Sequence, residues 1–133
     1  MSAEQSKDVV RKLLAKFGQC DVEGVIDMLT EDSTWWVGGK PDQFSLAGPK
    51  TKEEISAILR GVLGELPNGL EMRLRSMVAE GDTVAAEVES YGKLNNGRVY
   101  NNDYHFLFKV RGDKISLSKE YLDTMHTNSI FLT

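Results

Sequence analysis

The sequence predicts a single α+β domain spanning residues 1–133, with N-terminal helices packed on one face of a curved, mainly antiparallel sheet. Apolar residues recur at helical spacing up to about residue 64, and from Leu70 onward they alternate with polar ones, as in half-buried strands. Short turn sequences divide this second half into consecutive strands, which is the pattern of an antiparallel meander.

Three helices are expected in the first half of the chain. The first ends near Gly18, and Asp21 is the expected N-cap of a short second helix. Thr51 and Glu54 form a capping box, in which the hydroxyl and the carboxylate each bind a free amide at the start of a third helix. The apolar stripes of the first and third helices are Val9, Val10, Leu13, Leu14 and Phe17, and Ile55, Ile58, Leu59, Val62 and Leu63.

Strands are expected at residues 33–37 and at about 70–80, 83–94, 98–110 and 114–122. Residues 38–50 hold three glycines and two prolines and are expected to form a long loop. Trp35 and Trp36 are adjacent in a strand and therefore point to opposite faces. One indole should lie in the core or a pocket wall, and the other at an interface.

Composition excludes several classes of function. A net charge of −4 argues against a nucleic-acid partner, and the lack of any long apolar run argues against a membrane span. The N-terminus lacks the pattern of a signal peptide, and the lone Cys20 fits a cytoplasmic protein. The two histidines and scattered acids lack metal-ligand spacing, and no glycine motif for phosphate binding is present, so no cofactor and no metal are expected.

The register of the central hairpin is predicted from its turn. Asn96-Gly97 is typical of a two-residue type I′ turn, which would pair Glu89 with Tyr104. Side chains alternate along strands, so this register places one set of residues on a common face: Glu87, Glu89, Tyr91, Asn102, Tyr104, Phe106 and Phe108.

Two interpretations of Glu87 and Glu89 are open at this point. They can lie on a solvated face, with the aromatic residues forming an exposed cluster or a dimer interface. Alternatively, they lie at the mouth of a pocket walled by the helices. There, burial and mutual repulsion would raise the pKa of a carboxylate and make it a general acid or base near neutral pH.

The last hairpin also has two possible registers. A two-residue loop at Gly112-Asp113 would place Lys119 and Tyr121 on the aromatic face. A three-residue loop would instead bring in the alternate set, Ser116, Ser118, Glu120 and Leu122.

Three segments in this half resemble SnoaL-like proteins of the nuclear transport factor 2-like superfamily, a group that includes polyketide cyclases and ketosteroid-isomerase-like and limonene-epoxide-hydrolase-like enzymes. They are Gly97-Arg-Val-Tyr-Asn101, Lys114-Ile115 and Lys119-Glu-Tyr-Leu-Asp123. The resemblance implies a cone-shaped barrel with an apolar pocket between the helices and the concave sheet face. It favours the three-residue loop, and it implies that Glu89, Tyr91, Asn102, Tyr104, Glu120 and Leu122 point into the pocket.

The resemblance also bears on the reaction. Epoxide hydrolases of this type use an Asp-Arg-Asp arrangement with a tyrosine and an asparagine. The positions that match hold Glu89, Glu87, Glu120, Trp35 and Val37 here. Without the cation, epoxide hydrolysis is disfavoured. Ketosteroid isomerases take their base from a strand position that falls near residues 36–38, where this chain has no acid. A polyketide cyclase needs one acid/base carboxylate on the last strand, and Glu120 matches it.

We therefore expect a pocket protein that acts on or binds a hydrophobic small molecule. If it is an enzyme, the expected reaction is isomerisation or aldol-type cyclisation by proton transfer next to a carbonyl. Glu120 would be the acid/base, Glu89 and Glu87 would tune its pKa, and Tyr104 would donate to a developing oxyanion. The expected ligand contacts are Trp35, Val37, Tyr91, Asn102, Phe106 and Leu122. The alternative is a non-catalytic ligand-binding or assembly domain of the same fold.

The reverse face of the sheet is expected to be apolar enough to meet a partner. It would carry Val88, His105, Leu107 and either Leu117 or Tyr121, and proteins of the resembling family often form dimers through this face. A homodimer is therefore expected. His126 is expected to lie in a solvated C-terminal tail.

Overall fold

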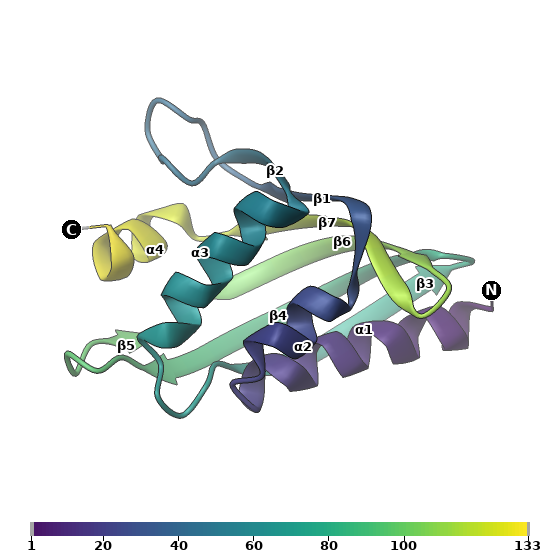
Figure 1. Ribbon diagram of the computed structural model, residues 1–133, viewed down its shortest axis with the longest axis horizontal. Helices are drawn as coiled ribbons and strands as arrows, with labels where there is room; N and C mark the ends of the chain where they lie inside the picture. Colours follow the sequence, from purple (N-terminus) through teal and green to yellow (C-terminus); the bar gives the residue numbers. More distant parts are fainter. Residues whose placement is uncertain (1, 133) are drawn as a thin grey trace.

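The computed structural model describes residues 2–132 and confirms the α+β class (Figure 1). The helices are α1 (Ala3–Gly18), α2 (Val22–Asp27), α3 (Lys52–Gly64) and α4 (Thr124–Phe131). The strands are β1 (Leu29–Val37), β2 (Gly48–Thr51), β3 (Glu71–Glu80), β4 (Thr83–Lys93), β5 (Val99–Tyr100), β6 (Asp103–Arg111) and β7 (Lys114–Leu122). None of the helices within residues 2–132 is long and apolar enough to span a membrane.

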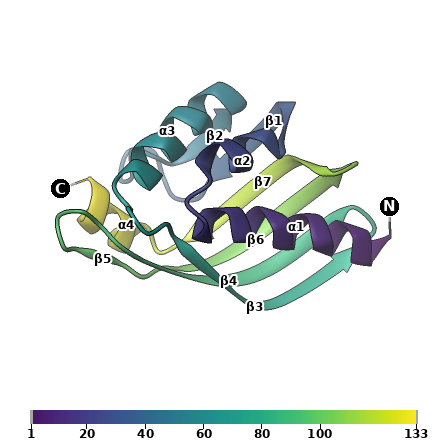
Figure 2. The same ribbon diagram turned by 60° about the horizontal axis from the view of Figure 1, so that its bottom comes forward.

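The strands form one curved sheet in the order β2-β1-β7-β6-β4-β3, and β5 pairs with β4. All neighbours are antiparallel except β1 and β7, which run parallel. Figure 2 shows α1 and α3 on the same concave side of this sheet, with α4 beside the end that carries β5. The apolar stripes of α1 and α3 meet the inner side chains of the strands and form the core.

The expected helix caps are present. The Asp21 side chain accepts from the amide of Gly24, and Thr51 with Glu54 forms the predicted capping box. A second capping box, formed by Ser2 and Gln5, starts α1 six residues before the first apolar residue of its stripe.

The expectations for the strands need several corrections. β1 begins at Leu29 rather than at residue 33, and β2 starts at Gly48, inside the segment expected to be loop. The strand expected over 98–110 is broken into β5 and β6 at Asn101 and Asn102. The C-terminal segment is a helix, α4, and not a solvated tail; its N-cap is Asp123.

The predicted register of the central hairpin was wrong by one residue. Leu94 and Arg98 flank a three-residue loop, in which Gly97 has a φ of +87°. Three-residue loops of this kind place a glycine in the left-handed region, whereas the predicted type I′ turn has only two loop residues. As a result Glu89 pairs with Asp103, and Tyr104 pairs with Val88.

This one-residue shift reverses the faces of β4 relative to β6. Ala86 and Val88 lie on the inner face with Tyr104, Phe106 and Phe108, and all five are buried. The other β4 residues of the predicted face, Glu87, Glu89 and Tyr91, point to the outer face.

The last hairpin combines parts of both predicted alternatives. Arg111 pairs with Lys114 around a two-residue turn, as the shorter loop requires. The register then shifts between Lys109 and Val110, because Ser116 is an extra residue on β7. The bulge restores the parity of the longer loop, so Glu120 pairs with Phe106 and lies on the inner face.

Candidate active site

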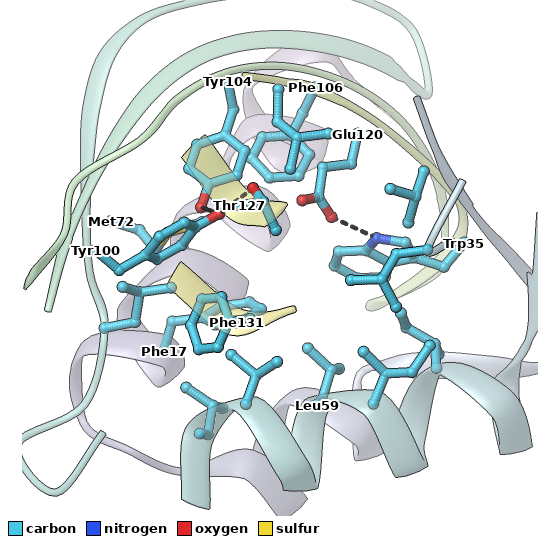
Figure 3. Close-up of a pocket in the computed structure, with 18 of the residues that line it drawn as sticks. Phe17, Trp35, Leu59, Met72, Tyr100, Tyr104, Phe106, Glu120, Thr127 and Phe131 are labelled. Atoms are coloured by element: carbon cyan, nitrogen blue, oxygen red, sulfur yellow. Dashed lines mark hydrogen bonds between the residues drawn. The ribbon is translucent and has the colours of Figure 1, made fainter. Parts of the chain in front are cut away.

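An apolar cavity of about 90 Å³ lies between α3 and the concave face of the sheet (Figure 3). Its floor comes from β1, β6 and β7, and α3 and Phe17 of α1 form the opposite wall. The connection from β1 to β2 contributes Phe44 and Leu46, and α4 contributes Thr127 and Phe131. Among the described residues that line it, Glu120 is the only one with a formal charge.

The carboxyl group of Glu120 points into this cavity. Trp35 Nε1 donates a hydrogen bond of 2.8 Å to Glu120 Oε1, and this is the only hydrogen bond to the carboxylate from the described residues. Burial raises the pKa of Glu120 to about 7, an effect that the Trp35 hydrogen bond partly opposes. Both the acid and the base form are therefore populated near neutral pH, as a group that takes and returns a proton requires.

A network of hydroxyl groups lies on the same side of the cavity. Tyr104 Oη lies 2.9 Å from Tyr100 Oη and 3.1 Å from Ser90 Oγ, and Tyr100 Oη lies 3.1 Å from Thr127 Oγ1. Burial raises the pKa of both tyrosines, that of Tyr104 well above its usual value, and the nearby Glu120 carboxylate adds to this. Both phenols therefore remain protonated at neutral pH and can donate hydrogen bonds.

Asn102 holds this network together from behind. Its Nδ2 lies within 3.1 Å of Tyr100 Oη, Thr127 Oγ1 and the carbonyl oxygen of Asp123, and its Oδ1 accepts from the amides of Asp103 and Asp123. The side chain is fully buried and does not line the cavity. Asn102 thus fixes α4 to the start of β6 and orients the hydroxyl groups.

A family model described as a SnoaL-like domain matches residues 10–117. The chain belongs to the SnoaL-like domain family. No curated protein matches it.

Solved structures share the SnoaL-like fold along nearly the whole chain. A nuclear transport factor 2-like protein of unknown function from Burkholderia pseudomallei is 18% identical with a TM-score of 0.79, and 100% of each chain is covered. TerC, co-crystallised with polyporic acid, is 19% identical with a TM-score of 0.77, covering 97% of this chain and 99% of the other. An epoxide hydrolase from M. tuberculosis, similar to limonene epoxide hydrolase, is 18% identical with a TM-score of 0.76, covering 98% and 91%. Identities this low support the fold and no particular reaction.

The structure of this SnoaL-like domain brings six of the predicted site residues to the cavity. They are Glu120, Tyr104, Trp35, Val37, Phe106 and Leu122. Asn102 lies behind the wall as a buried support. Trp36 points to the outer face, where Lys119 Nζ lies 4.8 Å from the centre of its ring.

Three of the predicted site residues lie away from the cavity. The expectation that Glu87 and Glu89 tune Glu120 and that Tyr91 contacts the ligand is wrong, because the corrected register turns these side chains outward. The open alternative, a solvated face, holds for Glu87, which is exposed, whereas Glu89 is half-buried on the same outer face and forms an ion pair with Arg75.

Several residues that line the cavity were not predicted as site residues from the sequence, among them Tyr100, Thr127, Phe44 and Phe131. For the last helix, a signal was present. Asp123 is a good N-cap residue, and Thr127 and Phe131 are four residues apart, as on one face of a helix. Tyr100 also had a signal, because it alternates with Asn102 and Tyr104 in the strand expected over residues 98–110. Phe44 had none, because it lies in a loop whose path depends on the packed structure.

Proposed function

We propose that this SnoaL-like domain catalyses proton transfer next to a carbonyl group on a neutral, hydrophobic small molecule, as an isomerase or an aldol-type cyclase. The observation that carries the proposal is the Glu120 carboxyl, which lies in an apolar cavity with its pKa raised to about 7. A base whose pKa lies near the working pH combines an adequate ionised fraction with useful basicity.

Glu120 has one oxygen for positioning and one for chemistry. Oε1 is held by the indole N–H of Trp35 at 2.8 Å, which leaves Oε2 to accept a proton from a carbon atom next to the ligand carbonyl. The same oxygen can return that proton to another carbon, which completes an isomerisation. In a cyclisation, the enolate carbon instead attacks a second carbonyl of the same molecule, whose oxygen takes up the proton from Glu120.

Tyr100 is the residue best placed to stabilise the enolate oxygen. Its Oη receives hydrogen bonds from Asn102 Nδ2 at 3.0 Å and from Tyr104 at 2.9 Å, so its own proton can turn from Thr127 to a ligand oxygen. Two donors into one phenol oxygen also make that phenol a stronger donor. Tyr104, the donor expected from the sequence, thereby becomes the support of Tyr100.

Deuterium exchange into cyclohexanone, a single-ring ketone, tests this proposal. We expect the protein to accelerate exchange of the protons next to the carbonyl in heavy water, with a rate that rises through about pH 7 as Glu120 ionises. Glu120→Gln should lower the rate by at least about a hundredfold. Glu87→Gln removes an equivalent charge from the outer face and should leave the rate unchanged. Equal rates for the wild type and Glu120→Gln would refute the proposal.

Ligand binding without catalysis is the competing function. It is favoured by the hydroxyl network, which is complete among the protein's own groups without a ligand. In that case cyclohexanone would bind, as a chemical-shift titration would show, and exchange would not be accelerated in the wild type.

A further inference from the structure

Loop 39–47, the connection from β1 to β2, differs from the other walls of the cavity in how it is held. Its backbone hydrogen bonds are internal: the amides of Gln43 and Phe44 donate to the carbonyl of Lys40, and the amide of Ala47 donates to that of Phe44. In the described part of the chain one further hydrogen bond reaches the loop, from Lys50 Nζ to the carbonyl of Ala47. The loop can therefore move as a unit without breaking a backbone hydrogen bond to the body.

The two ends of the loop have the backbone freedom that such a movement needs. Val37 pairs with Gly48, so the ends of the loop lie together at the start of the β1–β2 ladder. Gly39 and Gly48 stand at the two ends with φ of +111° and +107°, in the region that glycine adopts at no steric cost. Compact loops of this kind, closed at their ends and packed by their own side chains, are frequently functional.

The loop carries an aromatic side chain into the cavity. Phe44 is 3% exposed, although it lies between exposed Gln43 and Ser45, and it lines the cavity together with Leu46. A β-carbon at Gly39 would lie 3.2 Å from both the Phe44 ring and Thr124 of α4, so the seated loop packs closely against α4. Apolar contacts therefore hold the loop against the cavity and α4.

The neighbouring wall, helix α4, is tied to the body by polar contacts. Arg98 Nη1 donates to the carbonyls of Ser129 and Ile130, and the amide of Asn101 donates to His126 Nε2 at 3.1 Å. Asn102 adds a hydrogen bond to the carbonyl of Asp123. Of the two walls, loop 39–47 is therefore the one that can open at the lower cost.

Ligand size follows from the volume of the cavity. At about 90 Å³ it is smaller than an apolar cavity of about 150 Å³, which is known to hold one benzene molecule. A single ring therefore already fills the space under the closed loop, and a second ring has to displace part of the wall.

We infer that loop 39–47 is the lid of this pocket and that Phe44 determines the size of ligand it accepts. With Phe44 in the cavity, the pocket is restricted to neutral ligands with a single six-membered ring. The inference rests on the proposed ligand pocket and is independent of catalysis by Glu120. Larger ligands bind only when the Phe44 side chain moves out of the cavity.

Phenol and 4-phenylphenol test the inference, because they share a hydroxyl group and differ by one ring. Calorimetric titration of the wild type should show that phenol binds and that 4-phenylphenol binds at least about tenfold more weakly. This is the opposite of the usual trend, in which a second ring tightens binding because it buries more apolar surface. In Phe44→Ala the preference should reverse, with at least about tenfold tighter binding of 4-phenylphenol. Ser45→Ala, an exposed neighbour in the same loop, should behave as the wild type.

Three results would overturn the inference: wild-type protein that binds 4-phenylphenol more tightly than phenol, wild-type protein that binds neither, or an unchanged preference in Phe44→Ala. If the alanine variant does not fold, Phe44→Leu makes a smaller change in the same direction and decides the outcome together with the wild type. Glu120→Gln should retain the size preference while losing deuterium exchange, so failure of the lid and failure of the proposed reaction are distinguishable.

Discussion

Trp35 Nε1 donates a hydrogen bond of 2.8 Å to Glu120 Oε1 across the parallel β1–β7 pair. The register places Glu120 opposite Val37 and Ser118 opposite Trp35, so the indole and the carboxyl lie on the same inner face, two positions apart. This contact fixes one oxygen of the Glu120 carboxylate in the cavity wall while the other faces the cavity, and it makes the ionisation of Glu120 sensitive to a residue distant in sequence.

Replacing Trp35 by phenylalanine should raise the pKa of Glu120 above its value of about 7. The ring remains to fill the wall, and the hydrogen bond that lowers the pKa is lost. Carbon-detected NMR titration of the glutamate carboxylates measures the midpoint directly. Trp36→Phe is the matched control, because Trp36 lies on the outer face and should leave the midpoint unchanged. A midpoint that stays in place in Trp35→Phe would show that the indole does not tune Glu120.

Glu120→Gln should remove a dependence of stability on pH. Burial raises the pKa of Glu120 from 4.5 to about 7, so between these values the folded chain holds a proton that the unfolded chain releases. The contribution of this group to the free energy of unfolding therefore falls as the pH rises, by up to about 3 kcal/mol above the higher pKa. Glutamine stays neutral and has no such loss.

Urea unfolding of the wild type and Glu120→Gln at about pH 5 and about pH 8 measures this difference. The variant should gain stability relative to the wild type at the higher pH. Glu87→Gln, on the exposed outer face, should show no comparable change. An equal difference between wild type and Glu120→Gln at both pH values would contradict a buried carboxylate.

Asn102→Ala should destabilise the fold by about 2 kcal/mol or more, because it removes the buried hydrogen bonds from Asn102 Nδ2 to the hydroxyls of Tyr100 and Thr127 and leaves the amides of Asp103 and Asp123 without their acceptor. Asn101→Ala is the control. It loses contacts with Glu89 and with the carbonyl of Ser90 at an exposed position, so a smaller cost is expected. Urea denaturation of the two variants gives the comparison, and equal costs would mean that the Asn102 network contributes little.

The homodimer expected from the sequence stays a prediction, and the outer face of the sheet is where it can be tested. Trp36 and Tyr121 lie side by side there, with ring centres 5.0 Å apart, and Tyr121 is 44% exposed. Tyr121→Arg should weaken self-association by at least about tenfold in sedimentation equilibrium. Met125→Arg, which changes an exposed residue of α4, should not. A wild-type protein that sediments as a monomer at micromolar concentration would end this expectation.

Local patterns predicted the elements well. Asp21, Thr51 and Glu54 cap the helices that they were expected to cap, since capping is a contact between residues close in the chain. Patterns that depend on register were less reliable. Asn95-Asn96-Gly97 is compatible with loops of two or three residues, and the wrong choice exchanged the faces of Glu87 and Glu89 with those of Ala86 and Val88.

The expectation that Glu120 faces the cavity agrees with the structure, although the residues alone allowed either face of the strand. Its strand leaves a two-residue turn, which would turn Glu120 outward, and the bulge at Ser116 then turns it inward. No residue near Ser116 marks a bulge, so the resemblance to SnoaL-like proteins favoured the correct face before the geometry explained it.

The sequence by itself determined the α+β class, the caps and the apolar faces of the helices, because these follow from the spacing of residues near one another in the chain. Only the tertiary structure decided which carboxylate lines the cavity, how Tyr100 and Thr127 join Tyr104, and that Phe44 enters the cavity. Each of these depends on pairing between distant segments, where one residue of register or one bulge moves a side chain from solvent to the pocket.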